Sequence, residues 1–590
     1  MTAETGADSP DTWTLVEDRL DLSPHAETVF ALTNGALGVR GGLEECASSS
    51  QASFLAAAWD RYPLSYHERH FGFARTTDTR LPVADATAIR IRLGDISLSS
   101  GHARCEHHRR TLDLRQGCIL RTTRWQVPGA GTILVTAERM VSLTAANLSF
   151  IRMSVESIDF SGVLTLESAI CVHRRATGQR EDPRMVTGSE HHLHTDGCGA
   201  TKEAAWIGQR TETNCLRVHC LKTHRSNDLR CTGAGHDHGT VRQTFETQMH
   251  PGTRRTIEKF VVHVWNANPD VTATDLMLEA GALAAVAQTK SFDGALCEQA
   301  RVLERFWNDA GLRITGSPEV ERALHYNQFQ LFQGASRCDS AGIAAKGLTG
   351  EGYEGHVFWD TETFILPALV FQAPSLARPA LLWRIRLLDR ARAHARELNL
   401  VRGALYPWRT ISGDECSAHY PSGSAQFHIN AAIAYALVLY LHGTGDEQLL
   451  ANGGAELLFE TARIWPQLGY FNPRRSGAFC IPTVTGPDEY TALVDNNFYT
   501  NHMAQWHLRQ AVHWAALSAF SNAGQRCAAG SRMIVFRGVY ETFRDRLVAK
   551  ARSLKLGTAA GCDAVVFVCA VGLERSPDCG GSKRYSFPLG

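Results

Sequence analysis

The chain has 590 residues, with 60 basic and 60 acidic side chains and 44% hydrophobic residues, which is typical of a globular protein with at least one large core. The balanced charge and the lack of a lysine- or arginine-rich run argue against nucleic acid or an anionic membrane as a partner. The length predicts two large domains.

Targeting signals and cysteine usage indicate the compartment. Residues 1–14 are polar and mildly acidic, without the positive start and apolar stretch of a secretory signal, so we expect a cytoplasmic protein. The most apolar window, residues 431–441, is shorter than the roughly 20 residues that span a bilayer and predicts a buried helix instead. The 16 cysteines contain no Cys-x-x-Cys pair, and we expect them to be reduced.

Apolar and polar residues alternate from about residue 85 to residue 170, and less cleanly to about residue 264. Examples are Ile89, Ile91 and Leu93, and further on Ile133, Val135 and Ala137. A period of two predicts half-buried antiparallel strands, and turn signals such as Pro128-Gly129 separate them. We therefore predict an N-terminal antiparallel β-sandwich domain over residues 1–265.

The hydrophobic period changes to that of helices after Asn266. Helical stretches at 273–289 and 292–310 predict a helical linker over residues 266–316, and Ser317-Pro318-Glu319 is a plausible cap for the next helix. Further helices are predicted at 319–334, 377–398, 429–442, 454–465 and 496–517. Several are apolar on more than one side, which favours a double layer of helices, as in an α/α toroid.

The loops of the helical half are rich in aromatic and acidic residues. The strings are GEGYEGHVFWDTE at 350–362, YPWR at 406–409 with SGDE at 412–415, and GPDEY at 486–490. Sugar sites need flat apolar faces for pyranose rings and carboxylates for hydroxyl groups. Loop carboxylates are also common on solvated surfaces and as helix caps, so composition alone leaves both interpretations open.

The sequence resembles glycoside hydrolase family 65 in the strings at 350–362, 406–408 and 486–490, and also in VDNNFYTN at 494–501 and NGALGVRG at 34–41. The family contains inverting phosphorylases of maltose, trehalose and kojibiose, and some hydrolases. The resemblance covers about residues 15 to 515. It implies a multidomain β and α protein with a β-sandwich, a helical linker and a catalytic (α/α)6 barrel, which here would occupy residues 317–520 and be incomplete.

The resemblance also implies roles for single residues. The general acid of the family falls on Glu489, and the pair that holds the glucosyl unit falls on Trp359 and Asp360. Trp408 and Glu415 are candidate substrate-binding residues on the acceptor side. For Glu415 a solvated loop is the equal alternative, and Trp408 could instead pack beneath its loop.

Two further acidic residues in these loops have structural or open interpretations. We expect Asp488 to support the turn, because two adjacent carboxylates cannot easily face the same atom. Asp414 has the same two alternatives as its neighbour at position 415, an acceptor contact or a solvated loop.

Histidine pairs raise the question of a metal site. Alternating histidines share one face of a strand, and imidazole is a common ligand. The candidates are His107-His108, His191-His192-x-His194 and His236-x-His238. None has a full ligand set at an established spacing, so we expect no metal and no cofactor. The resemblance implies inorganic phosphate as co-substrate.

The resemblance stops after about residue 520. The Lys-Gln pair and the Ser- and His-bearing phosphate loop that family members are expected to have are not found in residues 521–590, which resemble out-of-frame translation or an unrelated extension. An open toroid would expose apolar faces that are otherwise buried.

The resemblance thus implies an inverting phosphorylase that converts a small disaccharide and phosphate into β-glucose 1-phosphate. The string WRTISGDECSAHYP at 408–421 favours a trehalose-type substrate. The alternatives are an inverting α-glucoside hydrolase and a catalytically inactive sugar-binding homologue, because the phosphate loop is missing. The usual dimer of the family is the default expectation for assembly.

Overall fold

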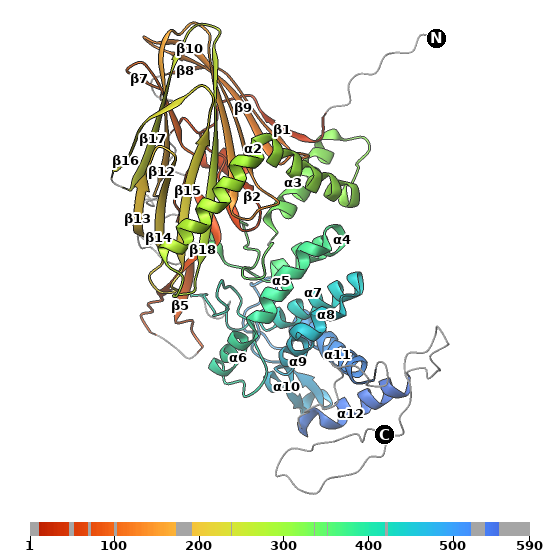
Figure 1. The fold of residues 1–590 in the computed structure, drawn as a ribbon. Coiled ribbons are helices and arrows are strands. Elements are labelled where there is room, and N and C mark those ends of the chain that lie inside the picture. Colours follow the sequence, from red (N-terminus) through yellow and green to blue (C-terminus); the bar gives the residue numbers. More distant parts are fainter. Residues whose placement is uncertain are drawn as a thin grey trace, which may run out of the picture. The chain divides into compact units, whose positions relative to one another are not determined.

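The computed structural model describes residues 11–46, 52–68, 72–98, 103–172, 192–237, 239–335, 337–350, 352–418, 423–520 and 537–553 (Figure 1). The chain forms two compact units. The first contains Met1–Tyr62, Asp78–Thr361 and Ala368–Ala380, and the second contains Pro63–Thr77, Glu362–Pro367 and Leu381–Gly590.

Three antiparallel sheets dominate the described part of the first unit. The largest, in spatial order, is β1 (Thr14–Glu17), β8 (Arg104–Asp113), β9 (Cys118–Val127), β10 (Gly131–Val141), β11 (Leu148–Ser157), β18 (Arg254–Asn266), β15 (Arg217–Arg225), β14 (Ala204–Arg210) and β13 (His194–Ala200). The second is β16 (Arg230–Asp237), β17 (Thr240–Met249), β12 (Gly162–Cys171), β6 (Ile89–Leu93) and β7 (Ile96–Ser97). The third is β2 (Leu32–Thr33), β3 (Leu37–Val39), β4 (Ser53–Pro63) and β5 (Thr76–Val83).

Alternating side chains of the first two sheets build a shared core. Ile89, Ile91 and Leu93 are buried, whereas Arg90 and Arg92 between them are exposed. The buried set meets side chains of the largest sheet, namely Trp125, Ile133, Val135, Met153, Val155 and Ile257. The antiparallel β domain that the alternation predicts is therefore confirmed.

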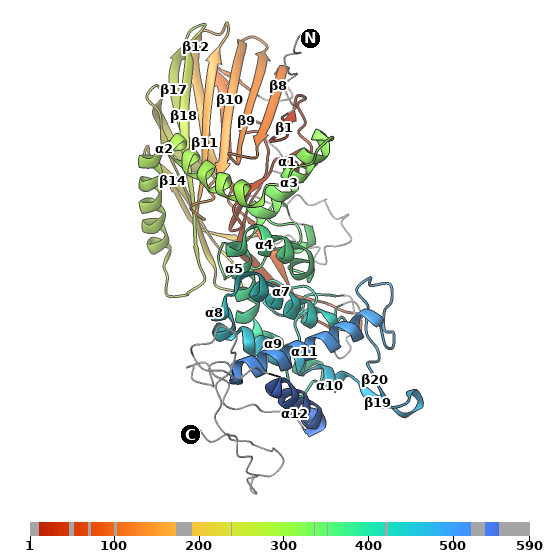
Figure 2. The same cartoon turned by 90° about the vertical axis from the view of Figure 1, so that its right-hand side faces the viewer.

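Helix α2 (Ala273–Ala310) covers the other face of the largest sheet (Figure 2). Phe260, Val262 and Val264 of β18 pack against it. The helix begins with a capping box between Thr272 and Asp275, and Ser291 breaks it with φ 64°. This break separates the two stretches that the sequence predicts as helices.

Shorter helices complete the first unit. They are α1 (Pro24–Val29), α3 (Pro318–Gly334) and the 3-10 turn η1 (Gly352–Gly355). The π-helical turn η2 (Thr361–Ile365) and helix α4 (Leu366–Gln372) each contain residues of both units. The predicted cap of α3 is confirmed, because the Ser317 hydroxyl accepts from the Val320 amide at 3.4 Å.

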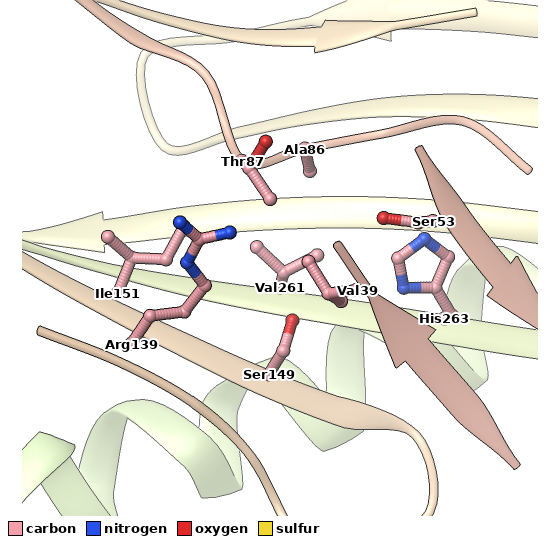
Figure 3. Close-up of a pocket in the computed structure, with 9 residues that line it drawn as sticks. All are labelled: Val39, Ser53, Ala86, Thr87, Arg139, Ser149, Ile151, Val261 and His263. Carbon is pink, nitrogen blue, oxygen red and sulfur yellow. The ribbon is translucent and has the colours of Figure 1, made fainter. Parts of the chain in front are cut away.

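A small cavity lies inside the first unit (Figure 3). Its lining residues are Val39, Ser53, Ala86, Thr87, Arg139, Ser149, Ile151, Val261 and His263. The volume of about 10 Å³ leaves room for at most a single water molecule. A sugar does not fit here.

The described part of the second unit is largely helical. Its elements are α5 (Pro374–Arg386, shared with the first unit), α6 (Leu388–Glu397), α7 (His428–Thr444), α8 (Glu447–Leu449), η3 (Leu450–Gly454), α9 (Ala455–Ala462), α10 (Trp465–Leu468), β19 (Tyr470–Asn472), η4 (Pro473–Arg475), β20 (Ala478–Cys480), α11 (Phe498–Phe520) and α12 (Arg537–Arg552). The single helix predicted over 377–398 is wrong, because Leu387 with φ −84° and ψ 4° separates α5 from α6.

Helix α7 is the central helix of this unit. It is buried on nearly all sides, as its apolar sequence predicts, and packs against α9 and α11 (Figure 1). Its Asn430 accepts from the Tyr406 amide at 3.0 Å and donates to the carbonyl of Ala404 at 2.8 Å. The helix thereby holds the loop that carries Trp408. Within the described ranges, no helix is long and apolar enough to cross a membrane.

The C-terminal segment contains regular structure that the sequence does not predict. Little helical period is visible after residue 520, yet Arg537–Arg552 forms α12, which packs against α11. The expectations for residues 521–536 and 554–590 lie outside the described residues.

We expect acid to destabilise the second unit through His507 of α11. Trp465 donates to its Nδ1 at 3.1 Å, and burial lowers the pKa of His507 to about 3. Between pH 6.5 and about 3 the unfolded chain therefore binds a proton that the folded chain excludes, so stability is complete above pH 6.5 and falls below it by about 1.4 kcal/mol per pH unit. Chemical denaturation at pH 7 and pH 4.5 measures this slope, and a His507→Gln variant should show a smaller one. Equal slopes would contradict the assignment.

Candidate active site

Trp359 and Asp360 end a constrained loop of the first unit, residues 345–361, which we name the Trp-Asp loop. Trp359 is half-buried and Asp360 is exposed. The loop contains three consecutive left-handed residues, Tyr353, Glu354 and Gly355, with φ of 57°, 55° and 78°. This conformation costs energy at Tyr353 and Glu354, and it persists only where neighbouring structure holds it.

Two hydrogen bonds fasten the segment that follows the left-handed turn. The His356 imidazole donates from Nε2 to the carbonyl oxygen of Asp78 at 2.6 Å, since only a protonated ring nitrogen can pair with a carbonyl. The Thr361 hydroxyl donates to the carbonyl of Ile343 at 3.0 Å. The Trp-Asp pair thus follows a turn that is fastened to the β domain.

An ion pair in the second unit begins directly after this loop. Arg384 binds both carboxylate oxygens of Glu362, at 2.7 Å and 3.0 Å, and each side chain is 1% exposed. The Tyr406 hydroxyl donates to the carbonyl of Arg384 at 2.6 Å. Sequence reasoning included Glu362 in an acidic, aromatic string but did not identify its partner, which lies 22 residues away in a helix.

The Trp408 loop is organised by Glu415, which is 7% exposed. Its Oε2 accepts from the Trp408 amide at 2.6 Å, and its Oε1 accepts from the Ser417 amide at 2.9 Å and the Arg409 amide at 3.5 Å. The alternative of a solvated Glu415 is therefore wrong. Substrate binding by Glu415 and by the half-buried Trp408 stays a prediction.

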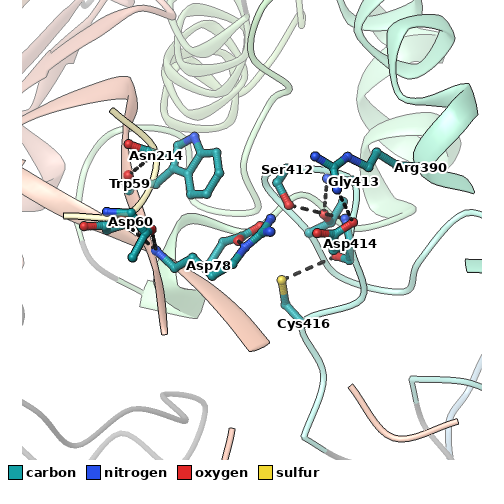
Figure 4. A network of polar contacts seen from close by, with 12 residues as sticks. Trp59, Asp60, Asp78, Asn214, Arg390, Ser412, Gly413, Asp414 and Cys416 are labelled. Carbon is teal, nitrogen blue, oxygen red and sulfur yellow. Dashed lines mark hydrogen bonds and ion pairs between the residues drawn. The ribbon is translucent and has the colours of Figure 1, made fainter. Parts of the chain in front are cut away.

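Asp414 lies at the tip of the same loop (Figure 4). Its amide donates to the Ser412 hydroxyl at 3.3 Å, its carbonyl accepts from the Cys416 thiol at 3.4 Å, and its carboxylate lies 3.5 Å from Arg390. Gly413 has φ 102°, and a Cβ there would lie 3.0 Å from Arg390 Cβ, so glycine fits this turn.

Glu489 lies in a closed loop between Val484 and Val494, whose main chains exchange hydrogen bonds of 3.0 Å and 2.9 Å. The neighbouring Asp488 accepts from the Thr491 amide at 3.3 Å and hydroxyl at 2.6 Å, and these bonds lower the pKa of Asp488. The prediction that Asp488 supports the turn is confirmed.

The turn presents the Glu489 side chain in a defined position. Glu489 has φ 63° and is exposed, and its Oε1 accepts from Nε2 of Gln426 at 3.2 Å. Gln426 is 2% exposed, and its own Oε1 has no hydrogen-bond partner among the described residues. No pattern in the sequence points to Gln426, which precedes Glu489 by 63 positions.

The predicted site residues are thus distributed over both units. Trp359 and Asp360 belong to the first, whereas Trp408, Glu415 and Glu489 belong to the second. Within the second unit the structure links Glu415 to Trp408 and Glu489 to Gln426. Over the described ranges, no three histidine, cysteine or acidic side chains gather as metal ligands would.

Family profiles match most of the chain. The profile described as glycosyl hydrolase family 65, N-terminal domain, matches residues 15–306, and that of the central catalytic domain matches residues 325–534. A profile of the aldehyde dehydrogenase family matches residues 503–569. That short match covers the segment in which the resemblance to family 65 stops.

Sequence similarity to known proteins agrees with the matches to the family 65 profiles. Alpha,alpha-trehalose phosphorylase of Thermoanaerobacter brockii is 35% identical over 518 residues, 85% of this chain and 65% of that protein. Kojibiose phosphorylase of Halothermothrix orenii is 28% identical over 83% of this chain and 63% of its own length.

The similarity extends to the fold. A structure titled putative kojibiose phosphorylase from human microbiome superimposes with a TM-score of 0.78 at 23% identity, over 86% of this chain and 66% of that one. The chain spans 65% of the length of the trehalose phosphorylase that it matches. On the two profiles and these similarities, the chain belongs to glycosyl hydrolase family 65.

Proposed function

We propose that this chain carries the chemistry of an inverting phosphorylase of a small α-glucoside, with trehalose as the favoured substrate. The identity of 35% to a trehalose phosphorylase, against 28% to a kojibiose phosphorylase, supports this preference. The products would be β-glucose 1-phosphate and glucose. The reaction needs phosphate as co-substrate and no cofactor.

The position of Glu489 is the observation that carries the proposal. A general acid must reach the leaving oxygen, and Glu489 stands exposed on a closed loop with Gln426 holding one of its oxygens. Glu489 protonates the glycosidic oxygen as the bond between this oxygen and C1 breaks. A phosphate oxygen forms the new bond to C1 from the opposite face, so the configuration inverts.

The remaining candidates divide between the two sugar units. Trp359 and Asp360 hold the glucosyl ring, by packing and by a charge-assisted hydrogen bond to a hydroxyl group. On the acceptor side, Glu415 acts through the main chain of Trp408, since both of its oxygens already bind loop amides.

We also propose that the helices of the second unit form part of an (α/α)6 barrel. The fold similarity to the kojibiose phosphorylase structure supports this. So does α7, which is buried on nearly all sides, as an inner barrel helix would be.

Hydrolysis is the second candidate function. The two matching profiles are described as domains of a glycosyl hydrolase family, a description that fits water as the nucleophile as well. Water as the nucleophile needs a carboxylate that acts as general base, whereas phosphate does not. A sugar-binding homologue without turnover is the outcome if neither nucleophile reacts.

The deciding experiment incubates the full chain with trehalose, maltose or kojibiose, with and without inorganic phosphate. We expect glucose 1-phosphate to appear from trehalose only with phosphate, and NMR to show the β anomer. Release of glucose alone, independent of phosphate, would support hydrolysis. No product from any of the sugars would contradict both functions, and calorimetric titration with glucose would then test binding.

A further inference from the structure

A buried arginine on strand β5 binds the Trp-Asp loop at two points. Arg80 is 4% exposed. Its Nη1 donates to the carbonyl oxygen of Gly347 at 2.7 Å, and its Nη2 donates to that of Gly355 at 3.3 Å. One guanidinium group therefore joins two carbonyls that are eight positions apart, and closes the stretch between them.

The loop packs closely against Arg80 at Gly355. A Cβ on Gly355 would lie 2.6 Å from Arg80 Cβ and 2.8 Å from its Nε. Only glycine allows this approach, and its left-handed φ of 78° completes the turn. Asp78, two residues earlier on β5, accepts from His356. Strand β5 thus holds the loop on both sides of the turn.

A second arginine of the same sheet supports this contact. Arg40 directly follows β3 and donates from Nη1 to the carbonyl oxygen of Thr349 at 2.5 Å. The main chain of β3 touches the loop as well, because a Cβ on Gly38 would lie 2.4 Å from the Cβ and the carbonyl oxygen of Leu348. The NGALGVRG string at 34–41 therefore packs on the loop that carries Trp359 and Asp360.

Burying the guanidinium group of Arg80 has a large desolvation cost. Burial alone lowers the pKa of Arg80 to about 10, with no carboxylate opposing the shift. Its Nε has no hydrogen-bond partner among the described residues. A buried charge that is met only by main-chain dipoles is costly to desolvate, so its benefit must come from what it holds in place.

We infer that Arg80 is a positioning residue for Trp359 and Asp360. By joining the carbonyls of Gly347 and Gly355 it closes the Trp-Asp loop and fixes where the pair stands, four and five residues beyond the second carbonyl. The catalytic consequence rests on the proposed function, in which this pair holds the glucosyl unit. The β domain would then position Trp359 and Asp360 through the hydrogen bonds of Arg80.

The test compares Arg80→Met and Arg80→Lys with Arg337→Met in the full chain. Arg337 is a matched control, because it also donates to main-chain carbonyls, of Asn34 at 2.8 Å and Phe332 at 3.2 Å, but does not touch the Trp-Asp loop. Burial lowers its pKa to about 10 as well. Hydrogen exchange with mass spectrometry measures the loop, and kcat and KM for several disaccharides measure the site.

We expect Arg80→Met to speed amide exchange of residues 345–361 about tenfold and to lower kcat/KM about 10- to 100-fold for every disaccharide with the same glucosyl half. Arg80→Lys should recover part of both losses, and Arg337→Met should change neither.

Equal exchange in Arg80→Met and Arg337→Met would overturn the inference, as would fast exchange with unchanged kcat/KM. If the parent chain shows no turnover, the proposed function fails. The exchange of residues 345–361, with and without glucose, still decides whether Arg80 holds the loop.

Discussion

Glu489→Gln is expected to lower kcat for trehalose by about 10² to 10⁴, because an amide cannot deliver a proton to the departing sugar oxygen. The shape of the side chain is kept, and its oxygen can still accept from Gln426, so the loop between Val484 and Val494 should remain closed. Steady-state kinetics with phosphate in excess measure the loss. Near-normal turnover in the variant would remove Glu489 from the role of general acid.

Two controls separate proton donation from damage to the loop. Asp488→Asn keeps an oxygen that accepts from Thr491, and we expect a loss of less than about tenfold, because the role of Asp488 is to shape the turn. α-Glucosyl fluoride should be turned over by Glu489→Gln with a much smaller loss, since fluoride leaves with little help from an acid. Equal losses on fluoride and trehalose would indicate a disrupted site.

Sequence patterns predicted the secondary structure well where it depends on residues that are close together in the chain. The alternation at Ile89, Ile91 and Leu93 gives β6, and the gap between two helical stretches coincides with the break at Ser291. The strand order could not be predicted, because β18 pairs with β11 and β15, whose positions along the chain are far from its own. Such pairings depend on side-chain packing across the whole sheet.

The candidate site shows the same limit at the level of single residues. Family strings led to Glu489, Trp359 and Asp360 as candidates, but not to the side chains that bind Glu489 and the Trp-Asp loop. Gln426 and Arg80 lie 63 and 267 or more positions from the groups that they bind. A glutamine in a loop and an arginine in a strand have no distinctive pattern, so only the folded chain reveals these contacts.

Glu415 illustrates why the type of residue alone left its role open. A carboxylate in a glycine-rich loop is equally consistent with solvent and with a sugar ligand. Its 7% exposure and its bonds to the amides of Trp408 and Ser417 come from the way the loop turns back on itself. The number of amides that converge on one carboxylate depends on backbone direction, which composition does not encode.

Arg384→Met is expected to cost about 3 to 5 kcal/mol of the free energy of unfolding, because it leaves the Glu362 carboxylate buried and unpaired. Both side chains are 1% exposed and share two hydrogen bonds. Arg390→Met is the matched control, since Arg390 pairs with Asp414 at 3.5 Å with 57% of its side chain exposed, and such pairs contribute about 1 kcal/mol or less. Urea denaturation of the second unit measures both losses.

A second substitution tests whether the lost stability comes from the unpaired charge of Glu362. Combining Arg384→Met with Glu362→Leu removes both charges and keeps roughly the same volume, so most of the lost stability should return. The restored variant should still bind the glucosyl unit less well than the parent, because Glu362 lies two residues beyond Asp360 and its ion pair anchors the turn that follows the Trp-Asp loop. If the double variant is as unstable as Arg384→Met, the arginine acts through its packing against Tyr406 and Trp383 rather than through its charge.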